Sequence, residues 1–254
     1  EKGSDTPNPH TLDEKATPMI RQTQTNRPYR KPLILLMVVF CSLQTATAAM
    51  AVPDLARVIE GIRATYGDLS GLSLQYQREV ITRSMTLLGK KARGDLASGH
   101  IYFKPPHFLK LQQEKPQPEI IITDGTFLWW YIPPQNKAYQ YSAREFGREL
   151  HLLTDIFRGM EKVEDNFQVL LHGTDEHRNH TMELIPDPPW QEVDRINLTV
   201  TPEYEIREIR IHNLMGTITV FELEGLTEKG EFPEGFFRLD LPEGVELIRE
   251  GPTQ

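Results

Sequence analysis

The side chains that could bind a metal are few in this chain. His172, His177 and His180 lie close together, with Asp175 and Glu176 between them, and imidazole and carboxylate groups are zinc ligands. Their spacing matches no standard zinc pattern, and the residues around them are polar, as in a hairpin loop. We therefore expect no metal site and no cofactor.

A nucleophilic catalytic centre is also unsupported. The stretch Gly71–Gln75 begins like the G-x-S-x-G turn that carries a serine nucleophile, but it fails at its last position. The chain contains no H-E-x-x-H helix, no phosphate-binding P-loop and no G-x-G-x-x-G fingerprint. The sequence therefore predicts that the protein is not an enzyme.

The charge balance excludes two classes of partner. The 254 residues include 28 Lys and Arg against 36 Asp and Glu, which gives a formal net charge of −8. A nucleic-acid-binding protein would show a basic stripe, and electrostatic docking on an anionic membrane needs clustered basic residues. We expect neither nucleic-acid binding nor that kind of docking.

The N-terminal region has the three parts of a secretory signal peptide. Arg27, Arg30 and Lys31 are basic, Leu33–Phe40 is an unbroken apolar run, and Ala46–Ala48 supplies the small residues of a cleavage site. The apolar run is too short for a transmembrane helix, which needs about 20 apolar residues. These features predict export of the protein.

The predicted cleavage divides the chain into two segments. We expect residues 1–48 to be a leader that is removed, with Ala51 as an alternative cleavage position, and residues 49–254 to be one domain. Cys41, the one cysteine, suggests a lipid anchor, but Phe40 before it is too large for the lipoprotein peptidase. We therefore expect neither a lipid anchor nor a disulfide.

The rest of the chain shows one clear helix followed by many short strands. Asp54 suits the N-cap of a helix at 54–66, apolar residues recur there at helical spacing, and Gly67 ends it. Helical spacing returns at 145–160. This order predicts one curved antiparallel sheet with helices packed on it. The expected strands are 72–80, 99–104, 108–112, 119–123, 126–132, 137–141, 167–171, 181–185, 193–200, 205–212, 217–223, 236–241 and 245–248.

Aromatic residues gather in the middle of the predicted sheet, where nine lie between Gly99 and Tyr141. Trp129 and Trp130 are adjacent, so in a strand they must point to opposite faces. Both faces should then contact apolar groups. The pattern alone favours a core on one face and a covering helix on the other, and a ligand cavity is the alternative.

Several stretches resemble motifs of one known family, the outer-membrane lipoprotein carrier proteins (LolA). Thr123–Pro133 is similar to the family's "sDGk.lW.Ydp" hairpin, and Gly94–Leu96 with Gly99–Phe108 resembles its "G.l..krP..f" strand and turn. The N-terminal helix and Leu74–Gln77 match its opening, and Phe236–Glu246 resembles its "F.f.pP.GvdV" ending. The four motifs occur in the family's order and cover roughly Leu55 to Ile248.

The resemblance implies a fold and a function. The fold would be a half-open antiparallel β-barrel covered by a few α-helices. The protein would be a monomeric periplasmic carrier without cofactor or enzymatic activity. It would take lipoproteins by their acyl chains from an inner-membrane ABC-type release complex and pass them to an outer-membrane receptor. Two alternatives remain, a periplasmic protein that senses lipids or lipoproteins, and an enzyme acting on envelope lipids.

The resemblance also implies which residues would form the site. The helices at 54–66 and 145–160 would form a lid, but Pro105 stands where the family often has an arginine that holds the lid shut. Lid closure would then need another group, and Lys104 and Arg93 are two candidates. The expected lid residues are Leu55, Ile59, Leu150, Leu153 and Phe157, and the expected lipid-binding cavity is lined by Leu74, Tyr76, Ile101, Phe103, Phe108, Leu111, Ile121, Leu128 and Trp130.

Overall fold

The structure is a computed structural model that describes residues 54–88, 94–143 and 148–249. The predicted leader and its cleavage site lie outside the described residues. Within the described ranges no helix is long and apolar enough to cross a membrane.

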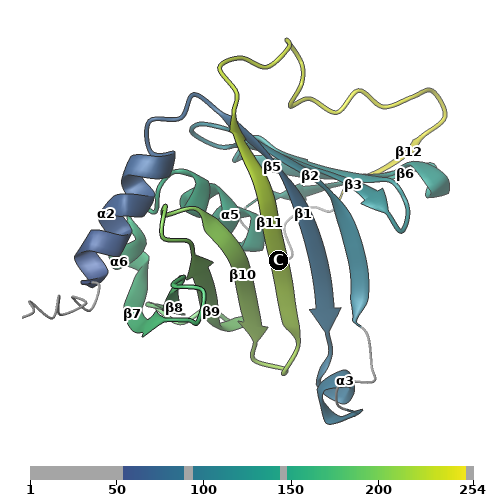
Figure 1. Cartoon of the computed structure of the whole chain (residues 1–254). Coiled ribbons are helices and arrows are strands. Elements are labelled where there is room, and N and C mark those ends of the chain that lie inside the picture. Colours follow the sequence, from purple (N-terminus) through teal and green to yellow (C-terminus); the bar gives the residue numbers. More distant parts are fainter. Residues whose placement is uncertain (1–53, 89–93, 144–147, 250–254) are drawn as a thin grey trace, which may run out of the picture. The chain divides into compact units, whose positions relative to one another are not determined.

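The domain is built from one sheet and a few short helices (Figure 1). The helices are α2 (Leu55–Tyr66), α3 (Arg83–Leu88), α5 (Arg148–Phe157), α6 (Val163–Asn166) and the 3₁₀ turn η2 (Pro133–Gln135). The strands are β1 (Leu72–Ile81), β2 (Asp95–Lys104), β3 (Phe108–Lys115), β4 (Glu119–Thr123), β5 (Phe127–Ile132), β6 (Lys137–Ser142), β7 (Phe167–Thr174), β8 (His180–Pro186), β9 (Val193–Val200), β10 (Ile206–Asn213), β11 (Ile218–Glu228) and β12 (Glu246–Arg249).

All twelve strands form one strongly curved sheet (Figure 1). Their order is β12-β6-β5-β4-β3-β2-β1-β11-β10-β9-β8-β7, and every described pair is antiparallel except β12 with β6. Over the described residues β12 and β7 are the outermost strands, so the sheet stays open. The prediction of a mainly β fold with a curved sheet and few helices is confirmed.

Helix α2 begins and ends where the sequence predicts. The side chain of Asp54 accepts a hydrogen bond from the backbone N–H of Ala56, which satisfies one of the free donors at the start of the helix. At the other end the N–H of Gly67 donates to the carbonyl of Arg63. Val58, Ile59 and Ile62 are buried along one side.

The structure differs from the prediction in the C-terminal region. Residues 236–241 are a turn followed by a segment without regular secondary structure, rather than a strand. The chain leaves β11, passes over the sheet and returns as β12 beside β6 (Figure 1). Gly235 has a φ of +75°, and the rings of Phe232, Phe236 and Phe237 pack against one another with centroids 4.9 to 5.1 Å apart. Ring packing therefore takes the place of strand pairing in this segment.

Candidate functional site

The two faces of the sheet have different chemistry. We call the face that carries Leu74, Ile101 and Leu111 the inner face, and the opposite one the outer face. Because strand side chains alternate, the pairing register fixes which residues share a face. On β1–β3 and β8–β11 the inner face is buried, and α2 and α5 pack against it, whereas on β4–β6 most of its side chains are only partly buried.

Two apolar rows cross the inner face from β1 to β6. One row has the cross-strand partners Leu72, Phe103, Leu109, Thr123, Leu128 and Tyr141. The next row has Leu74, Ile101, Leu111, Ile121, Trp130 and Tyr139, and Ile248 of β12 extends it.

The register places eight of the nine predicted cavity residues on this face. Seven lie in the two rows, and Tyr76 lies in the third row, next to Leu74 along β1. Phe108 is different, since it pairs with Lys104 on the outer face and its ring packs against Phe237, with centroids 5.7 Å apart. We therefore remove Phe108 from the candidate lining.

The predicted lid residues pack against the inner face. Ile59, Leu153 and Phe157 are fully buried, and Leu55 and Leu150 are partly buried against the same core. The ring of Phe157 lies 5.9 Å from that of Phe103 and 6.3 Å from that of Tyr66, measured between centroids. A space of only about 10 Å³ remains where α5 and α6 meet Phe167 and Leu184, so the packing there is close.

The structure tests one of the two groups considered as a substitute for the family's arginine. Lys104 is exposed and lies on the outer face, away from α5, and Arg93 lies outside the described residues. Instead α2 is fixed by the Tyr66 hydroxyl, which accepts a 2.9 Å hydrogen bond from the buried N–H of Ile206. Burial raises the pKa of Tyr66 to about 12, which keeps this phenol neutral.

The third row makes one end of the inner face polar. Trp130 donates a 2.9 Å hydrogen bond from its indole N–H to Glu119, and the side chain of Gln113 donates to the carbonyl of Gln117. Burial raises the pKa of Tyr76 to about 12, while the nearby Arg78 guanidinium opposes the shift. The apolar surface therefore ends at a border of hydrogen-bonding groups.

The sequence prediction of the site relied on the aromatic-rich stretch and therefore missed the part of the inner face formed by β8–β11. Beyond β1 the inner face continues across β11, β10, β9 and β8 with fully or nearly fully buried aliphatic residues. These residues alternate with polar ones along each strand, so the period of two could have revealed them. They include Met182, Leu184, Ile196, Leu198, Ile209, Ile211 and Leu223.

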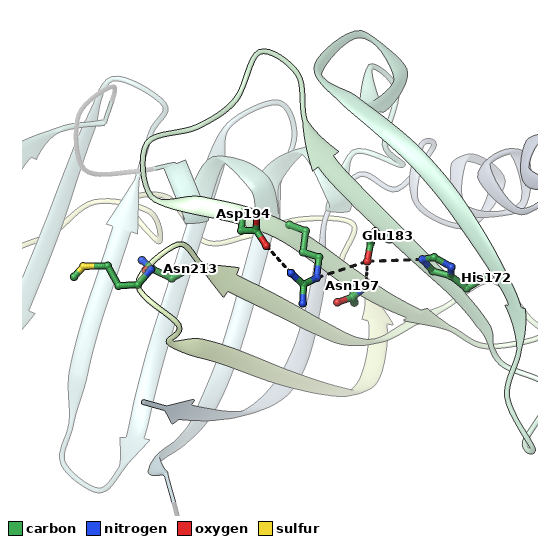
Figure 2. A network of polar contacts seen from close by, with 7 residues as sticks. His172, Glu183, Asp194, Asn197 and Asn213 are labelled. Atoms are coloured by element: carbon green, nitrogen blue, oxygen red, sulfur yellow. Dashed lines mark hydrogen bonds and ion pairs between the residues drawn. The ribbon is translucent and has the colours of Figure 1, made fainter. Parts of the chain in front are cut away.

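A separate polar network lies on the outer face of β7, β8 and β9 (Figure 2). Glu183 accepts a hydrogen bond from Asn197 and lies 3.7 Å from both His172 and Arg195, and Arg195 also pairs with Asp194. Each charged group has an opposite partner, as in a solvated ion-pair network. This arrangement indicates a structural role.

The three histidines considered for zinc have different partners. His177 lies 3.6 Å from its neighbour Glu176, and the ring of His180 stacks on Tyr204 rather than facing His172. Within residues 54–88, 94–143 and 148–249, no group of three or more His, Cys, Asp or Glu side chains could hold a metal.

A polar depression of about 330 Å³ lies between β1, β2, β3 and β11, and its side chains come mainly from the outer face. Its lining includes Gln75, Gln77, His100, Glu222 and Glu224. Such a lining does not suit an apolar ligand. The inner face is therefore the candidate functional site.

The fold and the site define a class of protein in which one face of a curved sheet is apolar and covered by helices. A sequence model described as outer membrane lipoprotein carrier protein LolA matches residues 85–240, and the chain belongs to the LolA family. The resemblance noted in the sequence is thus confirmed. Proteins of this family are carriers and not enzymes, in agreement with the sequence prediction.

Individual relatives are distant. The outer-membrane lipoprotein carrier protein of Nitrosospira multiformis is 24% identical over 212 residues, covering 83% of this chain and 94% of the relative. That of Alkalilimnicola ehrlichii is 25% identical over 217 residues, covering 82% and 86%. The crystal structure of a LolA superfamily protein from Nitrosomonas europaea aligns with a TM-score of 0.43 at 10% identity, covering 72% of this chain and 97% of that one.

Proposed function

We propose that the inner face binds the acyl chains of lipoproteins and that the protein carries them through the periplasm. It would take them from an inner-membrane ABC-type release complex and deliver them to an outer-membrane receptor. The observation that carries this proposal is the pair of apolar rows on the inner face, covered by helices that contact it mainly through apolar side chains. Family membership and the names of the relatives agree with it.

Acyl chains require this kind of surface. Each CH₂ group gains about 0.8 kcal/mol on leaving water, so a lipoprotein does not leave a membrane unaided. Branched and aromatic side chains provide apolar area without requiring hydrogen bonds from the ligand. Because Phe157 and Leu153 cover the same area in this structure, cargo would replace helix contacts with acyl contacts, and the exchange could run in both directions.

The hydrogen bonds favour α5 as the helix that moves. Helix α2 is fixed by Tyr66 to Ile206 and by an ion pair of Arg63 with Glu164 at 2.9 Å. Among the described residues, one side-chain hydrogen bond joins α5 to the rest of the chain, from His151 to the Ala143 carbonyl at 3.2 Å. Displacing α5 would therefore break mainly apolar contacts, which the acyl chains restore.

The polar border offers a place for the hydrophilic end of the cargo. Acyl chains lying along the two apolar rows would bring the lipid-modified N-terminus of a lipoprotein near the third row. Gln113, Glu119 and the phenol of Tyr76 are there, together with Arg78, whose Nε is buried without a hydrogen-bond partner among the described residues. These groups could hydrogen-bond to ester and amide groups of the cargo.

The direct test is native mass spectrometry of the protein recovered from the periplasm, combined with a transfer assay. We expect a complex with one triacylated lipoprotein, its release from inner-membrane vesicles that contain the release complex, and its delivery to outer-membrane receptor vesicles. A bound acyl species without transfer would favour the lipid-sensing role instead. Absence of both acyl species and transfer would contradict the proposal.

A further inference from the structure

Exposed apolar side chains are concentrated at one end of the sheet. Among the described residues, the large hydrophobic side chains classed as exposed are Phe127 and four others, Leu87 at 81%, Met215 at 75%, Leu214 at 59% and Leu96 at 51%. These four lie on α3, on the β10–β11 turn and at the start of β2, which share one end of the sheet (Figure 1). We call Leu87, Leu96, Leu214 and Met215 the apolar tip. Such a concentration of exposed apolar groups marks an interaction surface.

The elements of the apolar tip are in contact. Ile81 and Ile218 pair across β1 and β11 where these strands reach this end. The turn packs against α3, because a Cβ placed on Gly216 would lie 3.2 to 3.4 Å from the side chain of Arg83. The tip is thus one structural unit. Helix α3 extends beyond the ends of the strands (Figure 1).

The backbone N–H groups of residues 213–216 in this turn are all hydrogen-bonded. The N–H of Asn213 donates to Thr217, that of Leu214 to the Glu192 carbonyl, and those of Met215 and Gly216 both to Asn213. Figure 2 shows Asn213 at this turn. Placing an unpaired N–H group in an apolar medium costs free energy. A turn whose N–H groups are all paired avoids this cost when it enters the apolar part of a membrane. A partner that adds a strand would need free backbone groups instead.

One basic side chain beside the turn fits a lipid surface. Arg83 is exposed beside the turn, where a guanidinium can bind a lipid phosphate while the neighbouring Leu and Met side chains lie among the acyl chains. The chain as a whole has a net charge of −8 and is not attracted to an anionic bilayer. Contact must therefore be local and depend on apolar insertion.

We propose that the apolar tip docks the protein on a lipid bilayer by inserting Leu87, Leu214 and Met215 below the headgroups. This docking site is distinct from the inner face, so it does not depend on which cargo the inner face binds. Leu96 lies at its margin. The tip brings the protein to a membrane surface without a membrane-spanning segment.

The test is flotation of the protein, recovered from the periplasm, with vesicles of phosphatidylcholine and phosphatidylglycerol. The wild type should float with the vesicles, and the double variant Leu87→Ser/Met215→Ser should lose about tenfold in partition coefficient. Arg83→Gln should lose about fivefold on these vesicles and less on pure phosphatidylcholine, which carries the phosphate but no net charge. Phe127→Ser is the matched control, because the β4–β5 turn lies at the other end of these strands.

Several outcomes would overturn the docking proposal. They are a wild type that does not float, a double variant that partitions like the wild type, or an equal loss in the Phe127→Ser control. A double variant that floats normally but fails to deliver lipoprotein to the receptor would indicate a protein partner and also overturn it. Acyl-chain binding by the double variant, measured in parallel, tests the inner face separately and reports whether the variant is folded.

Discussion

Phe103 on β2 and Phe157 on α5 pack against each other on the inner face, with ring centroids 5.9 Å apart and planes inclined by 44°. The same Phe157 ring lies beside Tyr66 of α2, so one side chain contacts both the sheet and the neighbouring helix. Contacts of this type are strong in sum but not directional. They can hold the helix down and still be exchanged for an apolar ligand.

Phe157→Ala should weaken the cover over the inner face. Loss of a fully buried phenylalanine lowers the free energy of unfolding by about 3–5 kcal/mol. We expect this loss in urea unfolding, together with stronger binding of a fluorescent apolar dye by the folded variant. Phe237→Ala on the outer face is the control. If the dye binds equally well to both variants, Phe157 does not cover the site.

Tyr66 should make the protein sensitive to alkaline pH. Its pKa is raised to about 12 in the folded state, so between pH 10 and pH 12 only the unfolded chain loses the proton. The contribution of Tyr66 to the free energy of unfolding should therefore fall by about 3 kcal/mol over this range, and Tyr76, whose pKa is also about 12, should add a loss of its own. Urea unfolding of the wild type and of Tyr66→Phe at each pH measures the effect.

The Tyr66→Phe variant should show two differences from the wild type. At neutral pH it should be less stable by about 1–3 kcal/mol, because the buried N–H of Ile206 loses its acceptor. Above pH 10 its stability should fall less steeply. If the unfolding free energies of the two proteins fall equally between pH 10 and pH 12, the difference expected from Tyr66 is absent and the prediction is wrong.

His212 should contribute to acid sensitivity. Burial lowers its pKa below 6.5, the nearby Arg195 and Arg210 lower it further, and its Nε2 has no hydrogen-bond partner among the described residues. As the pH falls through 6.5, the unfolded state takes up a proton that the folded state does not, so stability is lost. His212→Gln should reduce this acid-side loss in urea unfolding, and an unchanged slope would contradict the prediction.

Gly61 permits the close approach of α2 to the loop before β10. A Cβ at this position would lie only 2.3 Å from ring atoms of Tyr204, so Gly61→Ala must displace either the ring or the helix. We expect a loss of about 1–3 kcal/mol in unfolding free energy, as is typical of overpacking. Gly230→Ala, whose added Cβ would have no atom within 4 Å, should leave stability nearly unchanged. Equal melting temperatures for the two variants would exclude this packing role.

The strand pattern could be predicted because alternation is a local property. Trp129 and Trp130 had to face opposite sides, and they do, since Trp130 lies in an inner-face row and Trp129 packs beside Phe127. The same rule reveals the error at Phe108. Phe108 and Leu111 are three positions apart in one strand, so they cannot share a face.

Other features depend on contacts between distant residues. The alternation in 236–241 predicted a strand, but Phe236 packs edge-on against Tyr102, and the Lys110 ammonium lies 4.3 Å from the Phe236 ring centroid. Helix α3 has only six residues, too few to show a helical period. Its position beside Gly216 could not be read from local sequence, and neither could the apolar tip.

The central claim is that acyl chains lie on the inner face, and the neighbouring tryptophans allow the most direct measurement. A photoreactive phenylalanine analogue is placed at the position of Trp130 in one protein and of Trp129 in another, and each is irradiated during transfer of a lipoprotein. We predict a covalent adduct with the acyl-modified lipoprotein from the Trp130 position and little or none from the Trp129 position. Equal adducts from both positions, or an adduct from the Trp129 position alone, would contradict the account.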